Sequence, residues 1–131
     1  QGRFFEPVET LNPGDMTDND PRLVSGWSEV QETSGEKCRI FYNEGLLRIN
    51  HETDAQFMIR LRIGTNTTVL KDTTDIILST SGAEYKSKVS ARRWFNWLLP
   101  KGADISGLTI KAAQPVPVRV YTVEIHRTRK E

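Results

Sequence analysis

Near its middle the chain reads Phe57-Met58-Ile59-Arg60-Leu61-Arg62-Ile63. Apolar side chains stand at every odd position, and Met58, Arg60 and Arg62 stand between them. Successive side chains of a β-strand point to opposite faces, so this period of two predicts a strand with one buried and one solvated face. We therefore expect Arg60 and Arg62 to point out of the fold together.

The segment 86–99 alternates in the same way. Its expected core residues are Phe95, Trp97 and Leu99. The residues that the alternation then turns outward are Arg92, Trp94 and Asn96. A slip of one residue in strand register would bury Trp94 and expose Phe95 instead, and the sequence leaves this alternative open.

The last segment, 118–127, is predicted to bury Tyr121, Val123 and Ile125 and to turn outward Thr122, Glu124 and His126. Further strand candidates lie at 23–30, 37–42, 46–50, within 69–79, and at 108–112. Short strands with turn residues every 8–12 positions are typical of an all-β sandwich. We predict an all-β fold, an antiparallel β-sandwich (jelly roll) of about eight strands, with one short helical turn near 103–105.

A chain of 131 residues corresponds to one domain. Its first part is rich in Pro, Gly, Asn and Asp, which is turn chemistry. We therefore expect a loop-rich N-terminal arm over 1–22, packed on a β-sandwich domain over 23–131. The residues expected to hold the arm in place, as an edge strand, are Phe4, Phe5, Val8 and Leu11, while Trp27 is expected in the core of the domain.

Charge is distributed unevenly along a chain whose formal net charge is only +1. Residues 1–36 contain eight acidic and two basic side chains, and the basic excess lies in 37–131. Such asymmetry is typical of a basic surface for an anionic partner, or of an acidic segment that packs across a basic body. We favour the second interpretation. A pI near 8.1 is less basic than is usual for a dedicated nucleic-acid binder, so we do not expect a nucleic-acid partner.

Composition argues against most catalytic and metal chemistry. A single cysteine, Cys38, cannot form an internal disulfide or a cysteine zinc site, and only two histidines are present. The chain contains no Gly-x-Ser-x-Gly elbow, no phosphate-binding glycine loop and no His-Glu-x-x-His. We expect no enzymatic activity, no cofactor and no metal. No apolar run approaches the ~20 residues of a membrane helix. No signal-peptide core follows Gln1, as in a secreted protein whose leader has been removed.

The order of these elements resembles the galactose-binding-like jelly roll found in many non-catalytic carbohydrate-binding modules. The resemblance rests on Gly26-Trp27-Ser28-Glu29, on the aromatic strand that ends at Leu98-Leu99-Pro100, and on 108–112 followed by 120–125. It spans most of residues 23–127. It implies a sandwich that binds sugar without chemistry, often at its loop end. The acidic pattern of a calcium loop is not evident in this sequence.

The outward residues supply what sugar recognition needs. We predict that Trp94, Arg92, Asn96, Arg60, Arg62 and Glu124 bind a ligand, with Trp94 stacking on a pyranose and the others bonding its hydroxyls. An excess of arginine favours acidic glycans, because guanidinium matches carboxylate and sulfate geometry. The polar loops at 43–45, 64–68 and 79–82 are a second possible location for the site.

The predicted function is a non-catalytic carbohydrate-binding module that recognises a polysaccharide or glycan. We expect it to belong to a larger secreted or cell-surface protein, with an appended catalytic or surface domain. The alternative is a structural or assembly sandwich of the capsid, tail or interdomain type, without a sugar ligand. Such a module would bind protein through exposed strands or through an N-terminal arm tipped by Phe4 and Phe5.

Overall fold

The computed structural model describes residues 5–33, 35–41, 44–50, 55–65, 74–89, 93–114 and 117–128. Within these ranges the chain forms eleven strands and one short 3-10 helix, η1 (Pro13–Asp15). The strands are β1 (Phe5–Leu11), β2 (Leu23–Ser25), β3 (Val30–Thr33), β4 (Glu36–Phe41), β5 (Glu44–Arg48), β6 (Phe57–Thr65), β7 (Thr74–Thr80), β8 (Ala83–Val89), β9 (Arg93–Leu98), β10 (Gly107–Ala112) and β11 (Val118–Thr128). The all-β prediction is confirmed, with more strands than the expected eight.

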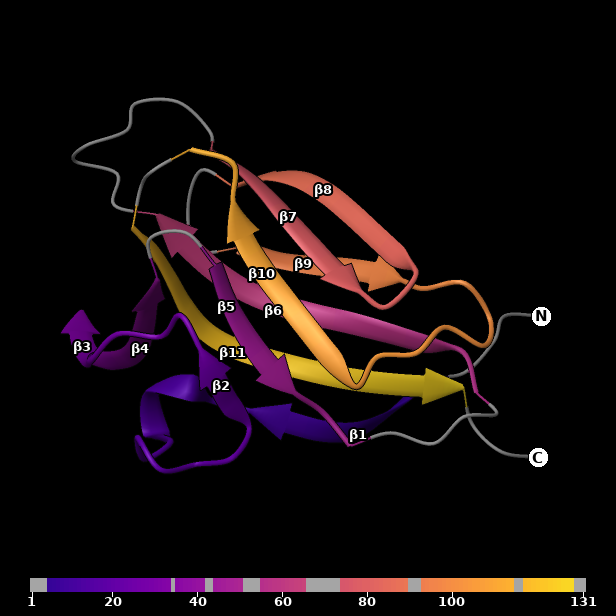
Figure 1. The fold of residues 1–131 in the computed structure, drawn as a ribbon, viewed down its shortest axis with the longest axis horizontal. Helices are drawn as coiled ribbons and strands as arrows, with labels where there is room; N and C mark the ends of the chain where they lie inside the picture. Colours follow the sequence, from indigo (N-terminus) through magenta and orange to yellow (C-terminus); the bar gives the residue numbers. More distant parts are fainter. Residues whose placement is uncertain are drawn as a thin grey trace.

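The strands form two antiparallel sheets that lie face to face (Figure 1). The first, which we call sheet A, has the order β3-β4-β11-β6-β9, and β1 pairs with the second half of β11. The second, sheet B, has the order β2-β5-β10-β7-β8. Most neighbours in each sheet are distant in the sequence, with β3–β4 and β7–β8 as the exceptions, so the fold is the predicted β-sandwich and not a simple meander.

The core fills the space between the two sheets. From β6, Phe57, Ile59, Leu61 and Ile63 are buried in it, as the alternation predicts. The facing strands of sheet B contribute the buried residues Leu47, Ile76, Leu78, Leu108 and Ile110, and Ile49, which follows β5, is buried with them. Apolar side chains occupy the inward face of β6. Because neighbouring residues of a strand point to opposite faces, Arg60 and Arg62 project from the outer face of sheet A.

Two predicted strands are each divided between the sheets. The segment 23–30 forms β2 in sheet B and β3 in sheet A, with the crossing at Gly26. A Cβ on Gly26 would lie 1.7 Å from the Glu44 carbonyl oxygen, and its φ is +81°, so only glycine fits this crossing. The segment 86–99 is divided in the same way. Its first residues belong to β8 in sheet B, and its later residues form β9 in sheet A. The sequence analysis assigned one strand to each of these segments, and the structure has two.

The N-terminal segment lies on the sandwich as the edge strand β1, paired with β11 from Phe5↔Thr128 to Leu11↔Val123. Leu11 is fully buried, as expected of an anchor, but Val8 is 47% exposed and is not one. The register of β1 shifts between Pro7 and Glu9, and this irregularity ends the strict alternation there. Phe4 lies outside the described residues.

The predicted helical turn is also displaced. A turn closed by a hydrogen bond from the Ala103 N–H to the Pro100 carbonyl, 3.1 Å, spans 100–103, and residues 103–105 contain no helix. The helical turn of the described chain is η1 instead, where Pro13 stands in the first turn and fixes φ.

A bulge in β11 changes which face its middle residues occupy. The pairing with β6 shifts register between Val120 and Thr122, so Val120 and Val123 both point into the core. Tyr121 is buried as predicted, but on the outer side of sheet A, in a separate small cluster with Cys38 and Ile40.

Candidate functional site

The outer face of sheet A gathers the predicted site residues from three adjacent strands. Across β9, β6 and β11, one row of partners is Asn96, Arg60 and Glu124, and the next row is Trp94, Arg62 and Thr122. Cross-strand partners point to the same side of a sheet, so these six side chains share one surface. We call this surface the sheet A face.

Arg60 lies at the centre of the sheet A face. Its Nε donates to Asn96 Oδ1 at 3.0 Å, and its Nη1 donates to Glu124 Oε1 at 3.1 Å. Its guanidinium also lies over the Trp94 ring, 4.6 Å from the centroid. Three neighbours therefore fix the position of one planar cation, and the guanidinium in turn holds the Trp94 ring.

Trp94 is the aromatic residue of β9 that faces solvent. Its residue exposure is 41%, whereas Trp97 is 5% exposed and packs in the core. Phe95 is half-buried against the same core. The structure therefore has the register in which Trp94 faces out, and not the alternative that would bury it. Trp27, predicted to be core, is half-buried at the margin of the core.

Arg62 repeats the arrangement of Arg60 one row away. Its Nη2 donates to both carboxylate oxygens of Glu36, at 3.2 and 3.3 Å. Its guanidinium lies over the Tyr121 ring, 5.3 Å from the centroid. Beside it, the Thr122 hydroxyl donates to Asn12 Oδ1 at 3.1 Å.

A shallow cavity of about 350 Å³ continues the face at this end. Its lining residues come from β6, β11, the segment after β1, and β4 with the turn before it: Asn12, Asp15, Gly35, Glu36, Lys37, Arg62, Tyr121 and Thr122. The sheet A face therefore extends from the exposed indole of Trp94 to this polar cavity.

Of the predicted site residues, the structure brings together Trp94, Asn96, Arg60, Arg62 and Glu124, and Arg92 lies outside the described residues. Sequence reasoning missed Glu36 as a member of the site. Glu36 lies just before the predicted strand 37–42, and no local pattern shows that β4 lies beside β11. Sequence reasoning also left out His126, whose Nε2 lies 3.0 Å from Glu124 Oε1, although the alternation of β11 had turned it outward.

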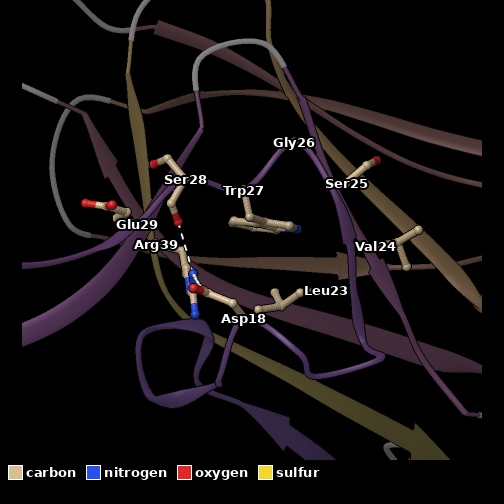
Figure 2. A pocket seen from close by; sticks show the side chains of 9 residues that line it. All are labelled: Asp18, Leu23, Val24, Ser25, Gly26, Trp27, Ser28, Glu29 and Arg39. Atoms are coloured by element: carbon tan, nitrogen blue, oxygen red, sulfur yellow. Dashed lines mark hydrogen bonds and ion pairs between the residues drawn. The ribbon is translucent and has the colours of Figure 1, made fainter.

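A second hollow, of about 440 Å³, lies where the chain crosses from β2 to β3 (Figure 2). Figure 2 shows the Trp27 ring in the middle of this pocket, with the Arg39 guanidinium meeting Ser28 and Asp18 beside it. The remaining lining residues are Leu23, Val24, Ser25, Gly26 and Glu29.

Trp27 is held in this pocket by its own contacts. Its Nε1 donates to the Leu46 carbonyl at 3.1 Å, and its ring meets Phe41 edge to face at 5.4 Å. A Cβ on Gly45 would lie 2.7 Å from the ring, so glycine lets the indole lie directly on β5. Because the indole N–H is bonded to backbone, the pocket offers a ligand the ring surface and little else from Trp27.

In the rest of the pocket, Arg39 connects neighbouring segments of the backbone through hydrogen bonds. It is 3% exposed, and its Nε donates to the Pro13 carbonyl at 3.0 Å and its Nη1 to the Ser28 carbonyl at 3.1 Å. Its Nη2 donates to the Met16 carbonyl, and Nη1 also pairs with Asp18 Oδ1 at 2.7 Å. These bonds attach the acidic N-terminal segment to sheet A, as expected of an acidic segment that packs across a basic body.

Two other groups have displaced pKa values with clear causes. Hydrogen bonds from the Arg22 side chain and backbone hold the pKa of Asp20 at about 2, below its ordinary value of 3.8. Burial raises the pKa of the Cys38 thiol, so this cysteine is a poor nucleophile and belongs to the packing beneath Tyr121.

Among the described residues no group of three or more His, Cys, Asp or Glu side chains is arranged to hold a metal ion. In the same part of the chain there is no helix with the length and apolar content needed to cross a bilayer.

Comparison with known proteins identifies the fold of the chain but does not assign the chain to a family. No protein-family model and no curated protein matches the chain. Several solved structures do, and carbohydrate-binding modules with the same sandwich are among them. The predicted jelly-roll resemblance is therefore confirmed at the level of fold.

Three of these structures show the extent of the match. The CBM22-1 xylan-binding domain from Paenibacillus barcinonensis Xyn10C has a TM-score of 0.59 and 10% identity, with both chains covered completely. The carbohydrate-binding module CBM6cm-2 from Cellvibrio mixtus lichenase 5A, in complex with cellotriose, has a TM-score of 0.54 and 13% identity over 96% of this chain and 100% of that one.

The third is the CBM22-1–GH10 part of endo-1,4-beta-D-xylanase 10B from Clostridium thermocellum, complexed with xylohexaose. It has a TM-score of 0.53 and 16% identity over 77% of this chain. The present chain spans 23% of that protein's length. At these identities the likeness establishes the fold alone.

Proposed function

We propose that this protein is a non-catalytic carbohydrate-binding module that recognises a polysaccharide or glycan on the sheet A face. The observation that carries the proposal is the pairing of an exposed Trp94 with a row of planar hydrogen-bonding groups, Arg60, Asn96 and Glu124. The similarity of the fold to several carbohydrate-binding modules supports it.

The chemistry of the face suits a sugar. A pyranose has an apolar side, which can stack on the part of the Trp94 ring that Arg60 leaves exposed. Its hydroxyls both donate and accept, and they can bond to Asn96, Glu124 and the remaining N–H groups of Arg60. Since these side chains are already held by one another, little side-chain entropy is lost on binding.

The sheet A face is a better candidate than the Trp27 pocket. In that pocket the donors of Ser28 and the Trp27 indole go to backbone carbonyls of the protein itself, and those of Arg39 go to backbone carbonyls and to the Asp18 carboxylate. On the sheet A face, by contrast, the bonds join side chains to side chains at a solvated surface, where a ligand hydroxyl can share or replace them.

Binding of this kind needs no reacting group. A buried cysteine with a raised pKa and a face of paired ions provide no activated nucleophile, which supports a role in recognition. We also propose that the module works beside a catalytic or surface domain in a secreted or surface protein, as the xylanase 10B structure combines a CBM22-1 module with a GH10 module.

Affinity electrophoresis in gels containing xylan or glucomannan tests the proposal. The native chain is expected to be retarded, and Trp94→Ala is expected to lose about 2 kcal/mol of binding, roughly thirtyfold in Kd. The matched control is Leu98→Ala, which removes an apolar side chain that is 53% exposed on the same strand but carries no ring.

Circular dichroism establishes that both variants fold. Equal retardation of the native chain and Trp94→Ala would exclude the Trp94 site. Absence of retardation in every gel, together with a concentration-dependent oligomer of the native chain, would favour the assembly role instead.

A further inference from the structure

The two outward arginines of β6 are built into equivalent clusters. Arg60 contacts the Trp94 ring and Glu124, and Arg62 contacts the Tyr121 ring and Glu36. Each cluster therefore contains an aromatic ring, a guanidinium and a carboxylate. The two lie two residues apart along one strand, about 7 Å.

In both clusters the guanidinium is already paired with a glutamate carboxylate. The Arg60–Glu124 pair is 3.1 Å long with side-chain exposures of 33% and 23%, and the Arg62–Glu36 pair is 3.2 Å long with exposures of 29% and 37%. Such partly shielded pairs are screened less by salt than fully exposed ones. Among the described residues of β11, Arg119 is another outward cation. It is in register with Ile40 on β4, and its charge favours the Cys38 thiolate, so it lies away from Trp94.

On these grounds, and resting on the proposed function, we infer that the sheet A face selects neutral glycans with adjacent hydroxyls over glycans that carry carboxylate or sulfate. A ligand anion would have to displace Glu124 or Glu36 or lie beside it, and like charges repel. A hydroxyl pair meets no such opposition, because one hydroxyl accepts from the guanidinium while its neighbour donates to the glutamate.

This inference reverses the preference for acidic glycans that the number of arginines indicates. Counting cations in a sequence does not reveal which carboxylates fold against them. Here Glu36 comes from β4 and Glu124 from β11, on the opposite side of β6 from Trp94. The glutamates thus act as specificity residues, since they leave the hydrogen-bonding geometry of the arginines in place and remove their net charge.

Removing the negative charges provides the test. Titration calorimetry with xylo-oligosaccharide and cello-oligosaccharide as neutral probes is compared with oligogalacturonate and heparin oligosaccharide as acidic probes, at ~0.15 M salt. The native chain is expected to bind a neutral probe at least tenfold more tightly than either acidic probe. The double variant Glu36→Gln/Glu124→Gln is expected to gain affinity for the acidic probes by tenfold or more, and to lose this gain at ~1 M salt.

The matched control is Glu84→Gln, which removes an exposed glutamate from β8 in sheet B and should change neither preference. Tighter binding of an acidic probe by the native chain would overturn the inference and leave the proposed function standing. An unchanged preference in the folded double variant would overturn it as well. No binding of any probe by the native chain would overturn the proposed function, and the inference with it.

Discussion

Replacement of Arg39 by methionine should destabilise the protein far more than replacement of its ion-pair partner. The guanidinium donates to the carbonyls of Pro13, Met16 and Ser28, and the residue is 3% exposed. Methionine keeps the chain length but removes the guanidinium donors from all three carbonyls, although the Pro13 carbonyl still accepts from the Met16 N–H at 3.3 Å. Loss of several bonds from a buried charged group costs about 3–5 kcal/mol, allowing for partial rehydration of the loop. That is a large share of the roughly 5–15 kcal/mol that stabilises a domain.

Asp18→Asn provides the contrast. The Asp18 carboxylate pairs with Arg39 at 2.7 Å, but its side chain is 83% exposed, so its loss should cost less than about 1 kcal/mol. Both free energies are measured by urea unfolding, followed by tryptophan fluorescence. If Arg39→Met cost less than about 1 kcal/mol, or if Asp18→Asn cost as much as Arg39→Met, the reasoning that Arg39 acts through backbone carbonyls would be refuted.

Three further expectations concern local features. Asp20→Asn should lower stability by about 1 kcal/mol, because its pair with Arg22 lies near the surface. The folded pKa of Asp20, about 2, lies below the ordinary 3.8, so this contribution to stability is full above pH 3.8 and is lost as the pH falls through 2. The free energies of unfolding of the native chain and of Asp20→Asn, measured in urea at several pH values, should therefore become equal near pH 2. A difference that stays constant over this pH range would contradict the assignment. Cys38, fully buried and with a raised pKa, should react with a thiol reagent only after unfolding, and rapid labelling of the native chain would show that it is accessible. Gly45→Ala should cost about 1–3 kcal/mol and alter the near-ultraviolet circular dichroism, because the added methyl meets the Trp27 ring; an unchanged spectrum would contradict the close approach.

Local patterning was sufficient for the two faces of β6 and β9. The alternation in 57–63 predicts both the buried side of β6 and the outward direction of Arg60 and Arg62, because one side of the strand is packed and the other is not. The same reasoning turned Trp94, Asn96 and Glu124 outward. Their convergence follows from the neighbouring positions of β9, β6 and β11, which the sequence analysis could only assume.

Long-range pairing could not be predicted in the same way. The contact of Glu36 with Arg62 joins strands that are separated in the sheet by β11, and no local signal encodes it. The bulge at 120–122 also escaped prediction, because an inserted residue shifts the alternation without any glycine or proline to mark it. As a result Tyr121 was correctly expected to be buried, but its packing beneath Arg62 was missed.

The central claim, that a glycan binds on the sheet A face, is tested most directly by the indole N–H signals of the three tryptophans. We suggest titration of the 15N-labelled protein with xylohexaose and with cellotriose, after assignment of the Trp94 signal in Trp94→Phe. A shift of the Trp94 signal that saturates, with the Trp27 and Trp97 signals unmoved, is the predicted result. A saturating shift of the Trp27 signal with Trp94 unmoved would place the ligand in the pocket between β2 and β3 and contradict the account.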